Sequence, residues 1–297
     1  MTRERPRRTS ALSVKPPRDL ALKAGASAHY EDPAYYTKTY RHRLQDVRYY
    51  VDLAIENGGP VLEYGCGNGR IAIPIARRGV AITGVDLSAP MVADLRKRVR
   101  YEDDEVRRRV RVVRGDMRSA RLKDRFPLIL CTFNAFLHLY TREDVERFLA
   151  RVKDHLTPHG ELVFDVSIPE PMELARDPAR AFGTPPFSYP KEGTPERFVR
   201  VRYAERFDYD KVRQILFVGM EFTPERGDPW MTPLAHRQFY PAELEALLHY
   251  NGFEIVDQRG GFDGSPLSVE SDTLITRCRV ARKRVGKSAE RQRRAAK

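Results

Sequence analysis

The chain has 297 residues, of which 41% are hydrophobic and 10% aromatic, so it can bury the core of a large domain and its composition is not that of a disordered protein. No stretch approaches the ~18 consecutive apolar residues of a membrane span, and no apolar signal sequence follows the basic N-terminus, so we expect a cytoplasmic protein. The formal net charge of +12 lies in the chain ends, because residues 1–23 carry +5 and residues 281–297 carry +7.

The two basic ends leave a folded body that is neutral overall. We interpret residues 1–24 as a disordered basic arm and residues 281–297 as a disordered basic tail. Basic tails also bind RNA or DNA by releasing counterions, so nucleic-acid binding through the ends is an alternative. Neither end interleaves aromatic residues that would stack on bases, and we therefore favour the solvated interpretation.

Helices and strands alternate after the arm. A tyrosine-rich stretch from residue 30 leads into a helix over residues 44–55, where apolar positions recur at helical spacing. We expect strands at 61–64, 80–85, 110–113, 128–133 and 161–166, with helices at 70–78, 88–99 and 141–155. Ser88 is the expected N-cap of its helix, and Thr141 with Asp144 predicts a capping box. Continuous apolar strands that alternate with helices predict a parallel sheet covered on both faces.

The pattern changes after residue 167. Residues 168–195 are rich in proline and predict irregular structure, residues 197–209 and 211–222 predict two antiparallel strands, and residues 224–233 predict a loop. A helix at 241–250 and strands at 253–258 and 273–280 complete the chain. The insertion follows the fifth strand, above strand ends where α/β proteins bind ligands, so we interpret residues 168–240 as a substrate cap.

A glycine-rich loop follows the first expected strand, with the sequence Glu63-Tyr64-Gly65-Cys66-Gly67-Asn68-Gly69. Glycine lets the backbone turn sharply and approach a ligand, and the next helix presents free N–H groups at its positive end. The last two glycines are one residue closer than in the dinucleotide fingerprint G-x-G-x-x-G. We predict a cofactor loop here, with a tight turn that binds nothing as the alternative.

Acidic residues follow the second and third expected strands. Asp86 is placed to accept hydrogen bonds from two ribose hydroxyls, unless it only starts the next helix. Asp116 could accept a hydrogen bond from an adenine amino group while Met117 contacts the ring, although by themselves these two residues could equally form a turn. Cys66, Cys131 and Cys278 lack the spacing of a disulfide framework or a zinc site, so we expect buried thiols and no bound metal.

In this order the motifs resemble those of class I S-adenosylmethionine-dependent methyltransferases, closely over residues 60–166. The glycine loop is similar to the family's first motif, Asp86 to its ribose acid, and Asp116 with Met117 to its adenine motif; residues 131–134 occupy the position of its fourth motif. The resemblance implies S-adenosylmethionine as cofactor and S-adenosylhomocysteine as product. It implies an α/β, Rossmann-like sheet of seven mostly parallel strands with the last antiparallel, to which our reading adds a β-rich cap after the fifth strand. The implied cofactor-binding residues are Tyr36, Tyr40, Glu63, Gly65, Gly67, Gly69, Asp86, Leu87, Met91, Asp116, Met117 and Asn134.

The flanks are similar to a subgroup that acts on small molecules. Residues 25–56 resemble its cofactor-covering segment, and the methyltransferase domain then comprises residues 25–167 and 241–280. Residues 133–138 resemble its segment after the fourth strand, which borders the transfer site, and residues 236–241 and 261–266 resemble its late segments. Asn134 is not followed by Pro-Pro-Tyr or Pro-Pro-Phe, and no Pro-Cys pair occurs, so amino methylation of adenine or glutamine and covalent cytosine methylation are unsupported.

We therefore expect a monomer or homodimer, not bound to membranes, that methylates a nitrogen or oxygen atom of a small molecule. His138 and, second, His236 are candidate catalytic bases because histidine titrates near neutral pH, although either side chain could simply be packed. Two other functions stay open at this point. One is an RNA or protein methyltransferase that uses the basic ends, and the other is a cofactor-binding module that recognises a partner through the cap.

Overall fold

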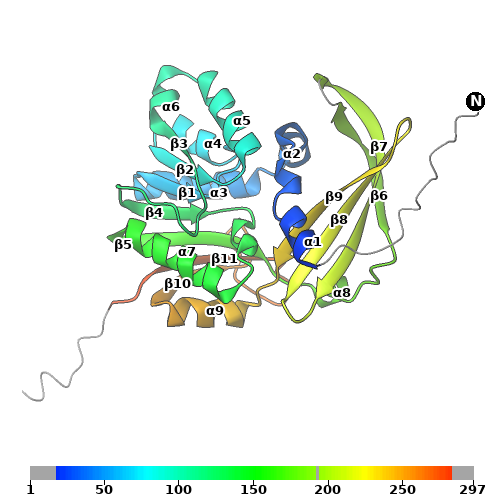
Figure 1. Ribbon diagram of the computed structural model, residues 1–297. Helices are drawn as coiled ribbons and strands as arrows, with labels where there is room; N and C mark the ends of the chain where they lie inside the picture. Colours follow the sequence, from blue (N-terminus) through cyan, green and yellow to red (C-terminus); the bar gives the residue numbers. More distant parts are fainter. Residues whose placement is uncertain (1–17, 192–193, 283–297) are drawn as a thin grey trace, which may run out of the picture.

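Two β-sheets face each other in the computed structural model, which describes residues 18–191 and 194–282, and short N-terminal helices lie between them (Figure 1). The seven-stranded sheet has the order β10-β11-β5-β4-β1-β2-β3. Its strands are β1 (Val61–Tyr64), β2 (Ile82–Asp86), β3 (Val110–Arg114), β4 (Phe126–Cys131), β5 (Leu156–Ser167), β10 (Phe253–Arg259) and β11 (Thr273–Val280). Strands β1 to β5 pair in parallel, and β11 runs antiparallel to both β5 and β10. The predicted Rossmann-like sheet, with its antiparallel last strand, is confirmed.

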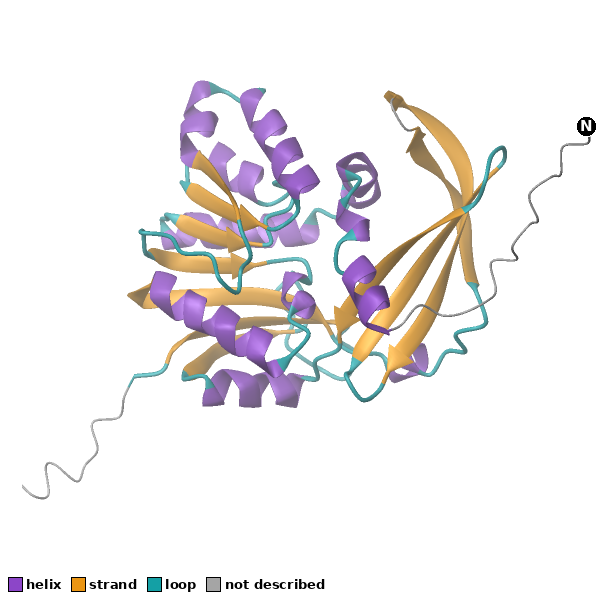
Figure 2. Cartoon of the chain, viewed as in Figure 1, coloured by secondary structure: helices purple, strands orange, loops and turns teal. Residues whose placement is uncertain are grey.

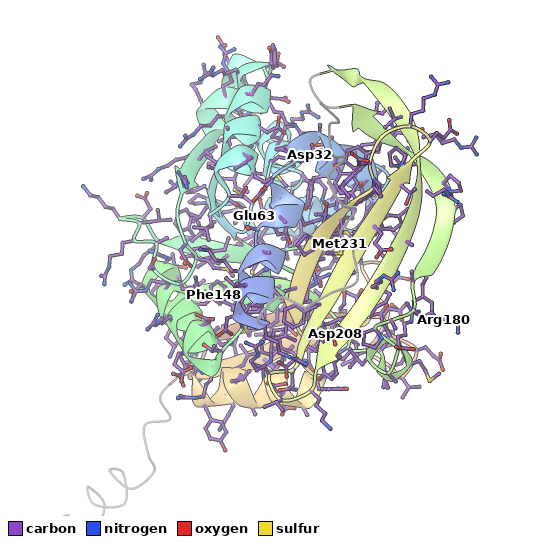
Figure 3. The ribbon with its side chains drawn as sticks, turned by 45° about the vertical axis from the view of Figure 1, so that its right-hand side comes forward. Asp32, Glu63, Phe148, Arg180, Asp208 and Met231 are labelled. Carbon is purple, nitrogen blue, oxygen red and sulfur yellow. The ribbon has the colours of Figure 1, made fainter. Side chains whose placement is uncertain are left out.

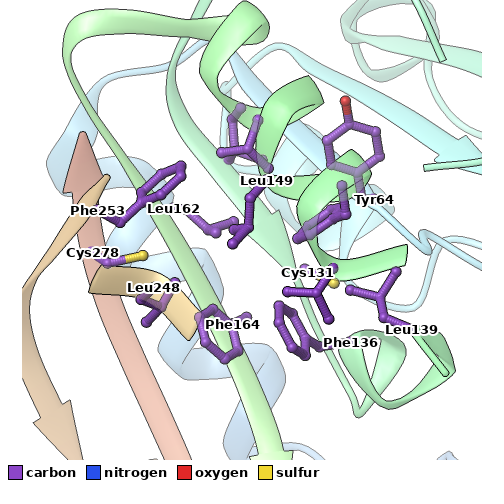
Figure 4. Packing of buried hydrophobic residues seen from close by; sticks show 14 of the residues in the cluster. Tyr64, Cys131, Phe136, Leu139, Leu149, Leu162, Phe164, Leu248, Phe253 and Cys278 are labelled. Atoms are coloured by element: carbon purple, nitrogen blue, oxygen red, sulfur yellow. The ribbon is translucent and has the colours of Figure 1, made fainter. Parts of the chain in front are cut away.

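Helices flank this sheet on both sides (Figure 2). On one face, α7 (Arg142–His155) and α9 (Pro241–Tyr250) bury Phe148, Leu149 and Leu248 against the strands, as Figure 4 shows for part of this core. On the other face, α3 (Gln45–Asn57), α4 (Ala72–Arg77) and α6 (Asp104–Arg109) pack on alternate strand residues. The predicted N-caps are confirmed, because Ser88 begins α5 (Ala89–Arg100) and Thr141 forms a capping box with Asp144.

The cap is a four-stranded antiparallel sheet in the order β6-β7-β8-β9. Its strands are β6 (Phe182–Lys191), β7 (Thr194–Asp210), β8 (Ile215–Pro224) and β9 (Trp230–Arg237), preceded by helix α8 (Pro171–Leu174). The prediction of irregular structure through residue 195 was wrong, because residues 182–191 form the edge strand β6, whose one neighbour among the described strands is β7, and an edge strand tolerates prolines. The predicted loop ends early at β9. The turn between β7 and β8 lies at residues 211–214, where the Asp210 carboxylate accepts the Val212 and Arg213 N–H groups.

The N-terminal helices hold the two sheets together. Helix α1 (Arg18–Gly25) corrects the expectation of a disordered arm through residue 24, since Arg18 pairs with Asp210 at 2.7 Å and Gly25 packs directly on Ala235 of β9. The 3₁₀ helix η1 (Ala28–Tyr30) and α2 (Pro33–Tyr40) follow. Asp32, labelled in Figure 3, is the N-cap of α2 and also accepts a hydrogen bond from the Tyr189 hydroxyl of β6 at 3.0 Å. Residues 1–17 and 283–297, which make up the rest of the predicted basic ends, lie outside the described residues.

Three further features concern the cysteines, the helices and the residue types that bind metals. All three cysteines are buried and free, as predicted. No helix in the described part of the chain is long and apolar enough to cross a membrane. Within the same residues, no group of three or more His, Cys, Asp or Glu side chains is arranged to hold a metal ion.

We expect Gly69→Ala to destabilise the fold more than Gly79→Ala. Both glycines have left-handed φ angles, of +84° and +91°, so either alanine strains the backbone by about 1–2 kcal/mol. A Cβ atom at residue 69 would also lie 2.3 Å from the buried Leu95 side chain, whereas residue 79 has no atom within 4 Å. Overpacking should add about 1–3 kcal/mol to the loss of unfolding free energy in Gly69→Ala, measured by urea denaturation. Equal losses in the two variants would show that the Leu95 side chain moves aside freely.

Candidate active site

A cavity of about 440 Å³ opens at the carboxyl ends of β1, β2 and β4. We call it the central cavity; its lining includes Gly67 after β1, Asp86 at the end of β2, Asp116 after β3, Phe133 after β4 and Tyr36 of α2. β1 lies between β2 and β4, so the strand order reverses at this point of the sheet. Such a switch point leaves a crevice between loops that turn in opposite directions, and open α/β sheets bind their ligands there.

The glycine loop and Asp86 are fixed to each other by backbone hydrogen bonds. The Gly67 N–H donates to Asp86 Oδ2 at 2.7 Å, and the Ser88 N–H donates to Oδ1 at 2.8 Å. Burial raises the pKa of Asp86 above its ordinary value, while these N–H groups act in the opposite direction. Gly65 and Gly67 have φ angles of +69° and +53°, and a Cβ atom on Gly67 would meet no atom within 4 Å. The backbone at residue 67 therefore faces the open space of the central cavity.

Glu63 brings a second carboxyl group to the central cavity from the middle of the molecule (Figure 3). Its Oε1 accepts a hydrogen bond from the Thr132 hydroxyl at 3.0 Å, whereas its Oε2 is buried without a hydrogen-bond partner among the described residues. Burial raises the pKa of Glu63 to about 8. Buried polar atoms are nearly always paired, so this oxygen is available to a hydrogen-bonding or cationic group that enters the cavity.

The loop after β4 closes the central cavity in a strained conformation. Phe133 and Asn134 have left-handed φ angles of 54° and 62°, which side chains rarely adopt outside sites that constrain them. The Phe133 N–H donates to the buried Asp165 carboxylate at 2.8 Å. The Asn134 side chain pairs with Ser167 of β5, through Nδ2 to Oγ at 3.0 Å and from the Ser167 N–H to Oδ1 at 2.7 Å. Asn134 therefore fixes the loop, and its amide points away from the central cavity.

The structure brings most of the predicted site residues to the central cavity. These are Tyr36, Glu63, Gly65, Gly67, Asp86, Leu87, Asp116, Met117 and His138. The others lie outside it: Gly69 and Met91 are buried, Asn134 is bound to Ser167, and Tyr40 and His236 border a different cavity. Asp116 holds the Arg118 guanidinium at 2.7 Å, so part of its hydrogen-bonding capacity is already used.

The second cavity, of about 760 Å³, lies between the cap sheet and α2. We call it the cap chamber. Its lining includes Tyr35 and Tyr40 of α2, and Tyr203, Glu205, Phe207, Met220 and His236 of the cap sheet. No motif in the sequence marks Glu205. The only signal for it was the mixture of aromatic and charged residues along β7, which does not tell which of them share a face.

Aromatic side chains separate the two cavities. Tyr36 borders the central cavity and Tyr40 the cap chamber, with their ring centroids 4.8 Å apart. His138 and His236 are related in the same way at 5.0 Å. We call these four side chains the aromatic partition. At each of these two pairs, the two cavities are separated by two rings in contact with each other.

His138 is held by hydrogen bonds on both ring nitrogens. The Tyr140 hydroxyl donates to the Ala235 carbonyl at 2.9 Å, so it accepts from His138 Nδ1–H at 2.8 Å. With the proton on Nδ1, His138 Nε2 accepts from the hydroxyl of Tyr30 at 2.7 Å. Tyr30 also borders the central cavity and was not singled out in the sequence. By contrast, Nε2 of His236 is buried without a hydrogen-bond partner among the described residues.

Burial keeps the histidines of this region uncharged. It lowers the pKa of His138 and of His29, which lies behind Tyr40, to about 4, and lowers that of His236 well below its ordinary value. At neutral pH each imidazole therefore has one nitrogen that can accept a proton or a hydrogen bond.

Comparison with known proteins places this site in context. Residues 61–160 match the family model of a methyltransferase domain. The chain is similar to a cypemycin N-terminal methyltransferase from a Streptomyces species, with 24% identity over 221 residues that cover 74% of this chain and 82% of that protein. It is also similar to dTDP-3-amino-3,6-dideoxy-alpha-D-glucopyranose N,N-dimethyltransferase of Streptomyces fradiae, with 28% identity over 128 residues, or 43% of this chain and 47% of that protein.

Solved structures share the fold across most of the chain. The methyltransferase CcbJ from Streptomyces caelestis has a TM-score of 0.70 and 22% identity, and the match covers 86% of this chain and 99% of that one. CalS10, an amino pentose methyltransferase from Micromonospora echinaspora solved with S-adenosylmethionine bound, has a TM-score of 0.61 and 21% identity, covering 82% and 96%. At these identities the likeness establishes the fold, including the family sheet predicted from the motifs.

We expect the buried histidines to make the protein sensitive to acid. Because the pKa of His29 is about 4 in the folded state and ~6.5 in the unfolded state, its contribution to stability is present above pH 6.5 and lost as the pH falls towards 4. This loss reaches about 2 kcal/mol between pH 7 and pH 5. Urea denaturation should show that His29→Gln loses about 2 kcal/mol less than the wild-type protein over this interval.

The exposed His159 provides the control, because His159→Gln should leave the pH dependence unchanged. The raised pKa of Glu63 acts in the opposite direction, since its contribution is present below pH ~4.5 and lost as the pH rises through about 8. Comparing each variant with the wild-type protein cancels that contribution. An unchanged pH dependence in His29→Gln would contradict a neutral His29 in the folded state.

Proposed function

We infer that this chain, a class I S-adenosylmethionine-dependent methyltransferase, transfers a methyl group to a nitrogen or oxygen atom of a small-molecule acceptor. The observation that carries this proposal is the pair of cavities on either side of the aromatic partition. The central cavity lies where the family binds its cofactor, and the cap chamber is closed over by an extra sheet. A chamber of this size suits a small acceptor.

The residues of the central cavity fit S-adenosylmethionine. Asp86 still has acceptor capacity on both carboxylate oxygens, which suits the two ribose hydroxyls. The unpartnered oxygen of Glu63 would be paired by the ammonium group of the methionine portion. Gly67 offers the open backbone surface that a bound cofactor would occupy. We assign Leu87 and Met117 to contacts with the adenine, and Asp116 to its amino group alongside the bond to Arg118.

The predicted residues outside the central cavity receive different roles. We propose that Gly69 and Met91 support the cofactor loop from below, and that Asn134 fixes the loop after β4 through Ser167. Tyr36 stays a candidate for direct contact, and Tyr40 supports it from the chamber side. The rings of the aromatic partition also favour a cation near their faces, as the sulfonium of the cofactor is.

When bound, S-adenosylmethionine supplies a methyl group on a sulfonium that is already a good leaving group. The task of the chain is therefore to align an acceptor lone pair with that group and to exclude water. The aromatic partition serves both ends, because Tyr36 is buried, the other three rings are half-buried, and the four rings lie between the two cavities.

If the accepting nitrogen or oxygen atom is protonated at neutral pH, it has to lose that proton before it is methylated. The two predicted bases, His236 and His138, differ in whether a ring nitrogen is available to accept the proton. Nε2 of His236 lies beside the cap chamber and has no hydrogen-bond partner among the residues that the structure describes. Both nitrogens of His138 are engaged, so we assign it to receive a proton only through the Tyr30 hydroxyl. With lowered pKa values, either ring passes a proton onward more readily than it retains it.

A second candidate acceptor is the N-terminal amine of a peptide. The similarity to a cypemycin N-terminal methyltransferase, which covers most of both chains, favours it specifically. The cap chamber is also bordered by exposed side chains of Arg41 and His42, so an acceptor longer than the chamber could leave it on that side.

Calorimetry with S-adenosylmethionine, followed by transfer of a labelled methyl group to separate metabolite, peptide and RNA pools, tests the proposal. We expect micromolar cofactor binding, about −8 kcal/mol, and label in the metabolite pool. Label in peptides alone would favour the second candidate, and label in RNA alone would contradict both. Tight cofactor binding without transfer to any pool would leave a binding module.

We expect Asp86→Asn to weaken binding of S-adenosylmethionine by about 10- to 100-fold, because charge-assisted hydrogen bonds to the ribose contribute about 1.5–3 kcal/mol. Calorimetric titration measures the change. Asp103→Asn, at an exposed carboxylate outside the lining of the central cavity, is the control and should bind as the wild-type protein does. Unaltered affinity in Asp86→Asn would remove this residue from the cofactor site.

We expect His236→Gln to lower the turnover of an identified acceptor at least about tenfold, without changing cofactor affinity, because glutamine cannot accept the proton. Steady-state kinetics and calorimetry on the same preparation separate the two effects. His249→Gln, on the exposed face of α9, is the matched control. Unchanged turnover would show that the proton leaves by another route.

A further inference from the structure

The cap sheet presents one carboxylate to the cap chamber. Side chains at alternate positions of a strand share a face, and on β7 these are Tyr203, Glu205 and Phe207. The neighbouring strand β8 lines the chamber with Leu216, Val218 and Met220. Among the described lining residues from β7, β8 and β9, Glu205 is the only charged one. A single carboxylate on an otherwise aromatic and aliphatic face is energetically unfavourable unless it has a partner.

Glu205 also lacks a cationic partner, unlike the charges on the opposite face of the same sheet. On that face, Arg206 donates to Glu221 at 2.5 Å. Glu205 accepts a hydrogen bond from the Tyr203 hydroxyl at 2.6 Å, and no ion pair joins it to a Lys or Arg that the structure describes. A partly buried carboxylate with only a neutral partner is poorly compensated for its lost hydration.

The other charges around the cap chamber do not provide that partner. Glu173 of α8 adds a second carboxylate to the chamber lining. Burial raises the pKa of Glu173, and the negative charge of Glu205 raises it further. The described cation that pairs with Glu173 is Arg176, at a distance of 3.8 Å. The ammonium of Lys38 lies over the Phe198 ring at 4.4 Å, and Arg41 is exposed and donates to His42. Negative charge therefore predominates on the cap side of the chamber.

A second, independent observation indicates that the cap chamber receives a polar ligand. Nε2 of His236, on β9, is buried beside the chamber without a partner among the described residues. The rings of Tyr35 and Tyr40 complete the wall opposite the cap sheet. A cation has favourable interactions with both a carboxylate and aromatic faces, whereas a neutral alcohol would leave the carboxylate without a counter-charge.

We infer that Glu205 is a specificity-determining residue that binds the basic nitrogen of the acceptor while that nitrogen is protonated, so that the chain selects acceptors with a basic amine over alcohols. Before transfer the ammonium gives up its proton, for which His236 Nε2, unpartnered among the described residues, lies beside the same chamber, and the neutral amine then has the lone pair that takes the methyl group. The inference rests on the proposed function, which assigns the acceptor to the cap chamber, and narrows it to amine-bearing molecules. Discrimination of this kind is strong, because the wrong ligand leaves a desolvated carboxylate unpaired.

The test is a binding measurement on the full-length protein saturated with S-adenosylhomocysteine. Two fluorinated probes of nearly equal shape, 2-(4-fluorophenyl)ethylamine and 2-(4-fluorophenyl)ethanol, are titrated and followed by fluorine NMR, which detects weak binding. We expect the amine to bind at least about tenfold more tightly than the alcohol. Equal binding of the two probes, or no binding of the amine, would overturn the inference.

Two matched variants locate the effect. Glu205→Gln keeps the shape of the side chain and should abolish the preference for the amine, while Glu221→Gln, on the opposite face of the sheet, should retain it. Unchanged binding of S-adenosylhomocysteine and an unchanged unfolding midpoint establish that both variants are folded. A full amine preference in Glu205→Gln would remove this residue from the acceptor site.

Failure of the inference and failure of the proposed function give different results. Methyl transfer to small alcohols alone, unaffected by Glu205→Gln, would overturn the amine selectivity and leave a small-molecule methyltransferase. Absence of transfer to any small molecule, with intact cofactor binding, would overturn the proposed function itself. Transfer to amines that weakens in Glu205→Gln through a higher KM, with kcat little changed, is the result we expect for a residue that binds the acceptor.

Discussion

The site depends on the Asp86 carboxylate, which is buried at the end of β2 and held by the N–H groups of Gly67 and Ser88. These two bonds tie the loop after β1 to the start of α5, and they compensate a buried charge that would otherwise be unfavourable. The loop can reach Asp86 only because Gly65 and Gly67 adopt left-handed φ angles. Once that connection is made, the central cavity lies between the loops after β1, β2 and β4.

The sequence predicted the Rossmann-like part well because several local signals agreed there. Apolar runs, the caps at Ser88 and Thr141, and the glycine loop all indicated the same elements, and the structure has them. The cap was harder to predict. The prolines in β6 suggested irregular structure, but β6 is an edge strand, and edge strands tolerate proline. Helix α1 escaped prediction because ion pairs with the distant turn between β7 and β8 hold it.

The candidate site divides in the same way. Residues that follow strands in sequence, such as Glu63 and Asp86, could be named from their positions alone, and both reach the central cavity. Tyr30 and Glu205 could not, because their roles depend on which elements meet in space: Tyr30 contacts His138 across more than a hundred residues, and Glu205 depends on the pairing register of β7 and β8. Asn134 shows the converse, since a motif position there serves loop geometry through Ser167.

All four cap strands come from one uninterrupted stretch, Phe182 to Arg237, between β5 and α9. The glycine loop, Asp86 and Asp116 all precede that stretch. The chamber-facing surface of the cap can therefore diversify by substitution or exchange of a single gene segment, while the glycine loop, Asp86 and Asp116 are inherited unchanged. The tether is the N-terminal region, where Gly25 fits against Ala235 and Asp32 against Tyr189. A cap exchanged from another protein would pack in the same position only if both contacts were preserved. The first helices and the inserted sheet would therefore have to change together.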